Sequence, residues 1–390
     1  MDHPVHALGS AVTVDELEDD PHAALARLRA HEPVSFVPAL GAWLVTRRDL
    51  ALAVMRDDES FTVDDPRFST GQVVGPSMLS RDGSEHARHR SPFALPFRLA
   101  ATRERLGEAV EDEARRLVDT IAATGRGDLR LDLAAPLAAR VMLVALGLES
   151  VSEQVVLSWY AQIVSAVSGI NIGHEPPAAS ARAVEQLAAE IIAAAGSDAP
   201  ASLLRDAGLH AADVSPEEIA SNAAVLLFGG IETTEGQIAM LLLDLLSHPA
   251  ELELALHRPE LRANAIEESL RREPAAASVD RYATREIELG GVVIAAGDLV
   301  TVSLTAANRD PATFADPDRF DIQRANAKLH LAFAQGPHVC LGMHLARLEM
   351  RAALDASLDR LPGLRLDPDR PARVRGLVFR KPDSVPVLVG

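Results

Sequence analysis

The chain has 390 residues, of which 48% are hydrophobic, 24% charged and only 4% aromatic. This composition is typical of a folded globular protein with an aliphatic core, and it favours helices packed on helices over a disordered or fibrous chain. The formal net charge of −18 repels the phosphates of nucleic acids and the surfaces of anionic membranes, so we expect no nucleic-acid and no membrane partner.

The cysteine content and the first residues indicate a soluble, cytoplasmic protein. Cys340 is the only cysteine, so no intramolecular disulfide can form, as expected in a reducing compartment. Residues Met1 to Asp20 show no signal-peptide pattern, and the longest apolar run, Ala223 to Ile231, is far shorter than the ~20 residues that cross a bilayer.

Helical periodicity dominates the chain, and short strands interrupt it. The first predicted strands are Val34 to Phe36 and Ala42 to Thr46, joined as a hairpin. Asn171 to Ser180, with a glycine and two prolines, is a predicted loop between helices. Ser215-Pro-Glu-Glu218 has the pattern of a capping box, and the helix that it opens is predicted to reach about Leu246.

The C-terminal part continues this pattern. Ile287 to Leu289 and Val292 to Ile294 flank Gly290-Gly291, which suits a two-residue hairpin turn. A helix is predicted to begin at Leu341 and to end before Pro362-Gly363. The last residues, Leu377 to Phe379 and Val385 to Val389, are predicted strands.

No repeat, linker or composition break divides the chain. We therefore predict one mainly α domain with small β-sheets over residues 1–390, of which 1–32 form an N-terminal segment and a first helix.

The surroundings of Cys340 point to a metal ligand. The cysteine lies in a loop bounded by glycine and proline, directly before a predicted helix. The positive end of a helix and its free backbone N–H groups stabilise a thiolate, which is a good ligand for a soft metal. A lone cysteine is otherwise most often a small buried hydrophobic residue.

The spacing of residues around Cys340 is more specific. Phe333, Gly336, His338, Cys340 and Gly342 form the pattern Phe-x-x-Gly-x-His-x-Cys-x-Gly, which strongly resembles the haem-binding loop of the cytochrome P-450 family. The resemblance implies that the Cys340 thiolate is the axial iron ligand of haem b, on the proximal side of the P450 fold. Ala334 departs from the pattern, since many members of the family have glycine there.

Other motifs of the family follow in the expected order. Glu268 and Arg271 form a Glu-x-x-Arg pair on one helix face. The pair alone could be an ordinary surface ion pair, but the resemblance implies a buried structural cluster completed by Arg319.

The centre of the long helix reads Gly229-Gly230-Ile231-Glu232-Thr233-Thr234. Two interior glycines cost roughly 1 kcal/mol each relative to alanine and should loosen the helix, unless they serve close packing. The resemblance implies that this segment crosses the distal face of the haem, where Thr233 hydrogen-bonds the dioxygen and Glu232 helps to relay protons.

Four basic residues match the family's anchors for the haem propionates. His86 and Arg90 are four residues apart and share a helix face, and Arg281 and His338 complete the set. Each alone could be an ordinary surface residue. Together, in this order, they extend the resemblance from about Pro33 to the C-terminus.

The resemblance implies a monooxygenase that inserts one oxygen atom from O2 into a C–H or C=C bond of a small molecule. Nothing in the chain resembles a nicotinamide-binding domain, so NAD(P)H would act only through a separate ferredoxin and ferredoxin reductase. We expect a monomer, with Arg88, Arg98 and Arg347 as a basic docking patch for an acidic ferredoxin.

The expected substrate is largely apolar and the expected role is tailoring in secondary metabolism. The resemblance implies a pocket of aliphatic and aromatic side chains, beside Gly229: Val73, Val74, Met78, Leu79, Ile163, Val167, Ile170, Leu226, Ala277, Val279, Val378 and Phe379. Two alternatives remain: a peroxide-driven oxygenase, and a haem protein that binds or senses a ligand without turnover. Both are disfavoured by the presence of Glu232 and Thr233.

Overall fold

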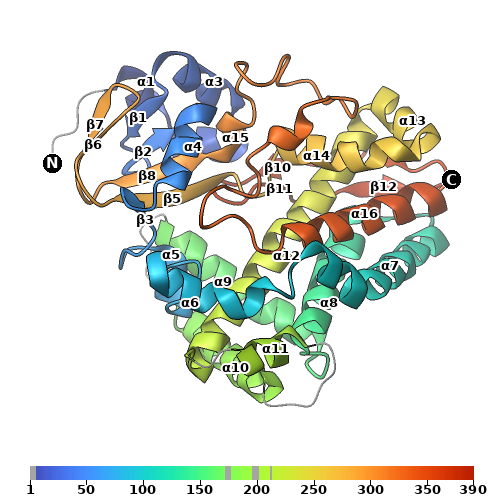
Figure 1. The fold of residues 1–390 in the computed structure, drawn as a ribbon. Coiled ribbons are helices and arrows are strands. Elements are labelled where there is room, and N and C mark those ends of the chain that lie inside the picture. The colour runs from blue at the N-terminus through green and yellow to red at the C-terminus, as the bar shows by residue number, and fades with distance from the viewer. Residues whose placement is uncertain (1–5, 172–176, 196–201, 211–212) are drawn as a thin grey trace.

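The computed structural model describes residues 6–171, 177–195, 202–210 and 213–390. These residues form a mainly helical fold with small β-sheets, as predicted (Figure 1). The helices are α1 Ala7–Ala11, α2 Val14–Asp19, α3 His22–His31, α4 Arg48–Arg56, α5 Ser69–Val74, α6 Gly83–Ala94, α7 Leu99–Thr124, α8 Ala135–Leu146, α9 Glu153–Asn171, α10 Ala178–Ala195, α11 Leu203–His210, α12 Pro216–Ser247, α13 Pro249–His257, α14 Arg262–Arg272, α15 Leu304–Ala307 and α16 Met343–Arg360, with short helical turns at Leu129–Ala134, Pro259–Leu261 and Ala327–Leu329. The predicted loop over 171–180 falls between α9 and α10, and its centre, 172–176, lies outside the described residues.

The strands are short and scattered. They are β1 Val34–Val37, β2 Ala42–Val45, β3 Phe61–Thr62, β4 Arg126–Asp128, β5 Ser278–Ala283, β6 Ile287–Leu289, β7 Val292–Ile294, β8 Leu299–Ser303, β9 Arg365–Leu366, β10 Val374–Arg375, β11 Lys381–Pro382 and β12 Pro386–Leu388. Five of them form a sheet in the order β1-β2-β8-β5-β3, at the upper left of Figure 1.

Two predicted hairpins are confirmed. β1 pairs antiparallel with β2, and β6 pairs antiparallel with β7. In the second hairpin Gly290 and Gly291 have φ angles of +60° and +85°, which glycine adopts without steric cost.

The prediction for the C-terminal strands is wrong in part. Residues 377–379 form no strand, only a bridge between Phe379 and Ala276. β12, inside the predicted segment 385–389, pairs with β4 and β9. These partners are remote in sequence, so local alternation of side chains did not reveal them.

The predicted long helix is confirmed as α12. The Ser215 hydroxyl accepts a hydrogen bond from the backbone N–H of Glu218 at 3.2 Å, and the Glu218 carboxylate accepts one from the Ser215 N–H at 2.9 Å. α12 crosses the middle of the molecule and packs against α8, α10 and α16 (Figure 1). By length and composition it could span a membrane, but 83% of its apolar window is buried inside the fold, so its hydrophobic residues form core.

The Glu-x-x-Arg pair is fully buried, and its third member differs from the prediction. The Glu268 carboxylate accepts two hydrogen bonds from Arg271, at 2.7 and 2.8 Å, and one from Arg324 Nε at 3.0 Å. The Arg319 side chain is instead 64% exposed. Only its backbone carbonyl takes part, accepting hydrogen bonds from Arg271 and Arg324.

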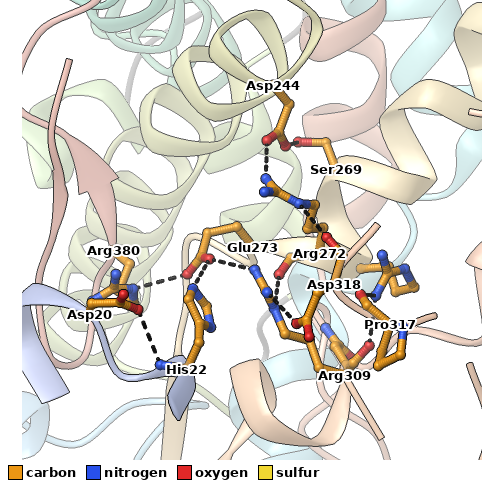
Figure 2. Close-up of polar contacts among 12 residues, drawn as sticks. Asp20, His22, Asp244, Ser269, Arg272, Glu273, Arg309, Pro317, Asp318 and Arg380 are labelled. Atoms are coloured by element: carbon orange, nitrogen blue, oxygen red, sulfur yellow. Dashed lines mark hydrogen bonds and ion pairs between the residues drawn. The ribbon is translucent and has the colours of Figure 1, made fainter. Parts of the chain in front are cut away.

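A second buried network lies at the end of α14 (Figure 2). Glu273 contacts His22 at 2.8 Å, Arg380 at 2.9 Å and Arg309 at 3.1 Å. Burial opposes ionisation, yet these partners lower the pKa of Glu273 to about 2. Because His22 begins α3 and Arg380 precedes β11, the network joins both ends of the chain to the helix that carries Glu268.

Candidate functional site

A cavity of about 320 Å³ lies where α12, α16, β5 and the Cys340 loop meet. Most of its wall is apolar, and a few polar groups converge on it, as in typical ligand sites. Nine residues predicted to hold the cofactor or to act beside it line this cavity: Arg90, Gly229, Gly230, Thr233, Arg281, Phe333, His338, Cys340 and Gly342.

The Cys340 loop presents the thiol to this cavity. The Cys340 N–H donates to the Phe333 carbonyl at 2.9 Å, which closes the loop. Gly336 has φ +77°, and a Cβ there would lie 2.1 Å from the Met55 carbonyl oxygen, so no other residue fits. α16 begins at Met343 rather than at the predicted Leu341, because Leu341 and Gly342 form a turn before it.

The surroundings of the Cys340 thiol contain groups that raise its pKa and groups that lower it. Burial raises the pKa of Cys340, while the Gly342 N–H and the charges of Arg90 and Arg347 act to lower it. The Gly342 N–H, at the end of the loop before α16, thus lowers the pKa of Cys340 as predicted from the sequence, but burial outweighs it and the pKa of the free thiol is raised. A soft metal ion would displace the proton directly.

Ala334, the departure from the family pattern, is one of two described non-glycine residues with positive φ, at +55°. This left-handed conformation costs an L-residue roughly 1–2 kcal/mol. The structure therefore explains why glycine suits this position.

The buried basic groups at the cavity fit a ligand with two carboxylates. Arg281 is 5% exposed, and its described hydrogen bond goes to the carbonyl of its neighbour Asp280. Arg90 donates to the Val339 carbonyl at 2.6 Å. Within the described part of the chain, neither guanidinium group forms an ion pair, and His86 Nε2 is buried without a hydrogen-bond partner. Since buried charges need partners, these groups beside a thiol fit the propionates of a haem.

His338 and His86 are coupled to Asp82, a residue that the sequence analysis missed. His338 Nε2 lies 2.6 Å from Asp82 Oδ1, and the rings of His86 and His338 are 4.4 Å apart. Asp82 also accepts hydrogen bonds from Thr62 and Val63. Despite burial, these contacts hold the pKa of Asp82 well below its usual range. Because Asp82 takes up Nε2 of His338, Nδ1 is the ring nitrogen that remains to contact a propionate.

Replacing Arg281 by alanine is expected to weaken haem retention. The propionate would then be buried without its partner, at a cost of about 3–5 kcal/mol, and Arg90→Ala should act in the same direction. The measurement is the haem-to-protein ratio after dilution or heating. Arg285→Ala, an exposed arginine just after β5, is the matched control. Equal retention in all three variants would refute the anchor role.

The glycine pair of α12 serves two different purposes. A Cβ on Gly230 would lie 2.4 Å from the Met142 sulfur, so Gly230 permits α8 to pack closely. A Cβ on Gly229 would meet nothing within 4 Å, because this residue faces the cavity. The predicted loosening is not observed, since α12 stays α-helical through both residues. Instead, the Thr233 hydroxyl donates to the Gly229 carbonyl at 2.6 Å.

Glu232 points away from the cavity that Thr233 lines. Its Oε1 lies 2.8 Å from Lys381 Nζ, and its Oε2 is buried without a hydrogen-bond partner. Burial raises the pKa of Glu232, and Lys381 opposes this effect. Lys381 also pairs with Glu235, which Arg130 contacts at 3.0 Å. Sequence reasoning missed Lys381, although the chain has only one other lysine, Lys328.

The residues predicted for the substrate pocket are distributed over two cavities and the hydrophobic core. Seven of them line the cavity beside Cys340: Met78, Leu79, Val167, Leu226, Val279, Val378 and Phe379. Ile170 and Ala277 line a second, neighbouring cavity. Val73, Val74 and Ile163 pack in the main hydrophobic core and line neither cavity.

The predicted basic docking patch is not formed. Arg88 pairs with Glu85 and Glu218, and Arg347 pairs with Glu267 at 2.7 Å and lies over the Phe333 ring. Arg98 alone of the three is exposed without an ion pair among the described residues. The acidic partners cancel the charge that the patch needed.

Comparisons with known proteins agree with this geometry. The family model "Cytochrome P450" matches residues 198–362. The chain is 36% identical over 384 residues to mycinamicin IV hydroxylase/epoxidase of Micromonospora griseorubida, covering 93% of this chain and 94% of that protein. It is 34% identical over 393 residues to nocardicin C N-oxygenase of Nocardia uniformis subsp. tsuyamanensis, covering 96% of each. The crystal structure of CalO2 has a TM-score of 0.87 at 31% identity over 97% of both chains. The likeness thus spans the whole fold as well as the cysteine loop.

Proposed function

Because this chain belongs to the cytochrome P450 family, we propose that it hydroxylates or epoxidises a largely apolar small molecule as a tailoring step of secondary metabolism. The observation that carries the proposal is that Cys340, on the loop before α16, and Thr233, on α12, line one mostly apolar cavity. The activities named for the mycinamicin relative, hydroxylation and epoxidation, support the same reaction type.

Haem b, when bound, supplies an iron centre that the cysteine thiolate ligates and at which dioxygen is activated. Arg90 and Arg281 would hold its propionates, and Cys340 is the thiolate. The Leu226, Val279 and Phe379 side chains exclude water from the wall where an apolar substrate would bind.

Thr233 and Glu232 have separate roles in this proposal. A change of rotamer turns the Thr233 hydroxyl from the Gly229 carbonyl towards the cavity, where it can hydrogen-bond dioxygen. Glu232, the residue before Thr233, takes up and releases a proton at Oε2. This oxygen has no hydrogen-bond partner and the pKa of the carboxyl group is raised, and both features suit that role. Lys381 sets the position of the carboxylate at Oε1.

The presence of Glu232 and Thr233 distinguishes the proposed monooxygenase from its two alternatives, a ligand sensor and a peroxide-driven oxygenase. A ligand sensor needs no acid and hydroxyl on the distal helix, and a peroxide-driven oxygenase receives its oxygen and protons together. A thiolate-type reduced carbon monoxide spectrum, with turnover driven by ferredoxin and reductase, is the expected result. Turnover with peroxide alone at the same rate would favour the peroxide-driven enzyme.

We further propose that this P450 is a cytoplasmic monomer that takes electrons one at a time from a separate ferredoxin, reduced by a ferredoxin reductase at the expense of NAD(P)H. Membership of the cytochrome P450 family supports this arrangement. Reconstitution with defined ferredoxins is the direct test.

Thr233→Ala is expected to uncouple electron consumption from product formation. Removing the hydroxyl touches neither thiolate nor anchors, so haem binding and the first reduction should be unchanged. Protons would no longer be delivered in order, and product per NAD(P)H consumed should fall several-fold while peroxide rises. Thr233→Ser, which retains the hydroxyl, is the control and should stay close to wild type. Equal coupling in Thr233→Ala and wild type would reduce Thr233 to a packing residue.

A further inference from the structure

A second cavity, of about 350 Å³, adjoins the one beside Cys340. The two share five lining residues: Phe68, Ser69, Ser278, Asp280 and Val378. The second cavity lies against the five-stranded sheet, on strands β5 and β8, which run side by side in Figure 1. A molecule bound across the shared wall would therefore extend from the sheet towards the thiol.

The two faces of β5 contribute differently to the two cavities, although Ser278 and Asp280 line both. Alternate residues of a strand face opposite sides of a sheet. Val279 and Arg281 line only the cavity beside Cys340, whereas Tyr282 lines only the second one. Asp280 lies opposite Thr301 in the antiparallel pairing of β5 with β8, and directly opposed side chains share a face. The Thr301 hydroxyl donates to Asp280 Oδ1 at 2.7 Å, so the carboxylate is on the face of the second cavity.

Asp280 has no ion pair among the described residues, unlike the two arginines that line this cavity. Arg67 pairs with Asp65 at 2.7 Å and Arg380 pairs with Glu273 at 2.9 Å. Asp298 accepts a hydrogen bond from Trp43 Nε1 at 2.9 Å. For Asp280, the structure gives no ion pair among the described residues, and the Thr301 hydroxyl is its side-chain partner.

The ionised form of the Asp280 carboxylate is also destabilised by its surroundings. Burial raises the pKa of Asp280, and only Thr301 and the charge of the adjacent Arg281 oppose the effect. A half-buried carboxylate without a charged partner costs free energy that a cation placed against it would recover. The walls around it combine apolar side chains, among them Leu25, Leu44 and Phe68, with hydroxyl groups such as those of Ser303 and Thr305.

We propose that the second cavity receives the alkylammonium end of an otherwise apolar substrate, with Asp280 as its counter-charge and the apolar part reaching the cavity beside Cys340. This inference rests on the proposed monooxygenase function, since it assigns the substrate class of the same site. A half-buried acid without an ion pair selects a cation over an uncharged group of equal shape, because only the cation repays the desolvation of the carboxylate.

The test compares two probes of equal shape on the ferric holoenzyme: hexanoylcholine, which carries a quaternary ammonium, and 3,3-dimethylbutyl hexanoate, its uncharged isostere. A quaternary nitrogen cannot ligate iron, so direct coordination does not confuse the result. Affinities are measured by isothermal titration calorimetry, with the spin-state shift of the haem as a second readout. We expect wild type to bind hexanoylcholine at least about tenfold more tightly, which corresponds to ~1.4 kcal/mol.

Asp280→Asn should reduce this preference to about twofold or less, and Asp280→Ala provides a second variant should the first fold poorly. Glu286→Gln removes one negative charge at an exposed position beyond β5 and should retain the preference. Equal affinity of wild type for both probes, or an unchanged preference in both Asp280 variants, overturns the inference. The proposed function fails separately, if the reduced carbon monoxide spectrum lacks the thiolate band.

Discussion

Cys340→Ser is expected to lose haem, or to shift its reduced carbon monoxide absorption away from the thiolate position, and to lose monooxygenase turnover entirely. Serine keeps the size of the side chain but removes the soft sulfur donor, and no other cysteine exists in the chain to replace it. The hydrogen bond from the Cys340 N–H to the Phe333 carbonyl is a backbone contact, so the loop itself should persist.

The measurement is the carbon monoxide difference spectrum together with the haem content of the purified protein. Ala334→Gly is the matched control in the same loop, because it relieves the positive φ of +55° without touching the ligand. It should retain the thiolate spectrum. An unchanged spectrum in Cys340→Ser would exclude Cys340 as the iron ligand.

Glu268→Gln is expected to abolish the folded holoprotein or to lower its melting temperature severely. The substitution removes the negative charge that Arg271 and Arg324 share, where Glu268 and Arg271 are both 0% exposed. Two buried guanidinium groups would then lack their counter-charge, at a cost of about 3–5 kcal/mol. Such a loss is a large part of a total stability of about 5–15 kcal/mol.

Substitutions of Arg324 and Arg319 test which of the two arginines is the third member of the buried Glu268–Arg271 cluster. Arg324→Ala should destabilise the protein strongly, since the Arg324 side chain contacts the Glu268 carboxylate at 3.0 Å. Arg319→Ala should change the free energy of unfolding by no more than about 0.5 kcal/mol, as for most surface positions. Thermal unfolding of the three variants, with haem absorbance as a second probe, gives the comparison. Strong destabilisation by Arg319→Ala with none by Arg324→Ala would reverse the assignment.

Features with a local cause could be predicted from the sequence. The Ser215 capping box determines where α12 begins, because the cap satisfies backbone N–H groups within the same turn. Gly290-Gly291 determines the hairpin of β6 and β7, because the required φ angles are available to glycine. The spacing around Cys340 likewise indicated a cofactor loop, because the residues that shape this loop are close neighbours in the chain. The family comparisons confirm the fold.

Features that depend on remote contacts could not be predicted in the same way. Arg319 and Arg324 both follow the Glu-x-x-Arg helix in sequence, and only the path of the chain decides that the Arg324 side chain reaches Glu268 while Arg319 contributes a carbonyl. Glu232 was assigned beside Thr233, but Lys381, from a strand far along the chain, holds its carboxylate on another side of α12.

Local sequence was sufficient for the family resemblance, the beginning of α12 and the one possible thiolate ligand, because capping, turn geometry and residue spacing act within a few residues. The packing of remote elements decided which apolar residues face a cavity. Val167 and Ile163 both lie on α9, are both buried and both pack in the main hydrophobic core, yet only Val167 also lines the cavity beside Cys340. Helical periodicity separates buried from exposed faces, but whether a buried side chain meets a neighbour or a cavity depends on the other elements packed against it.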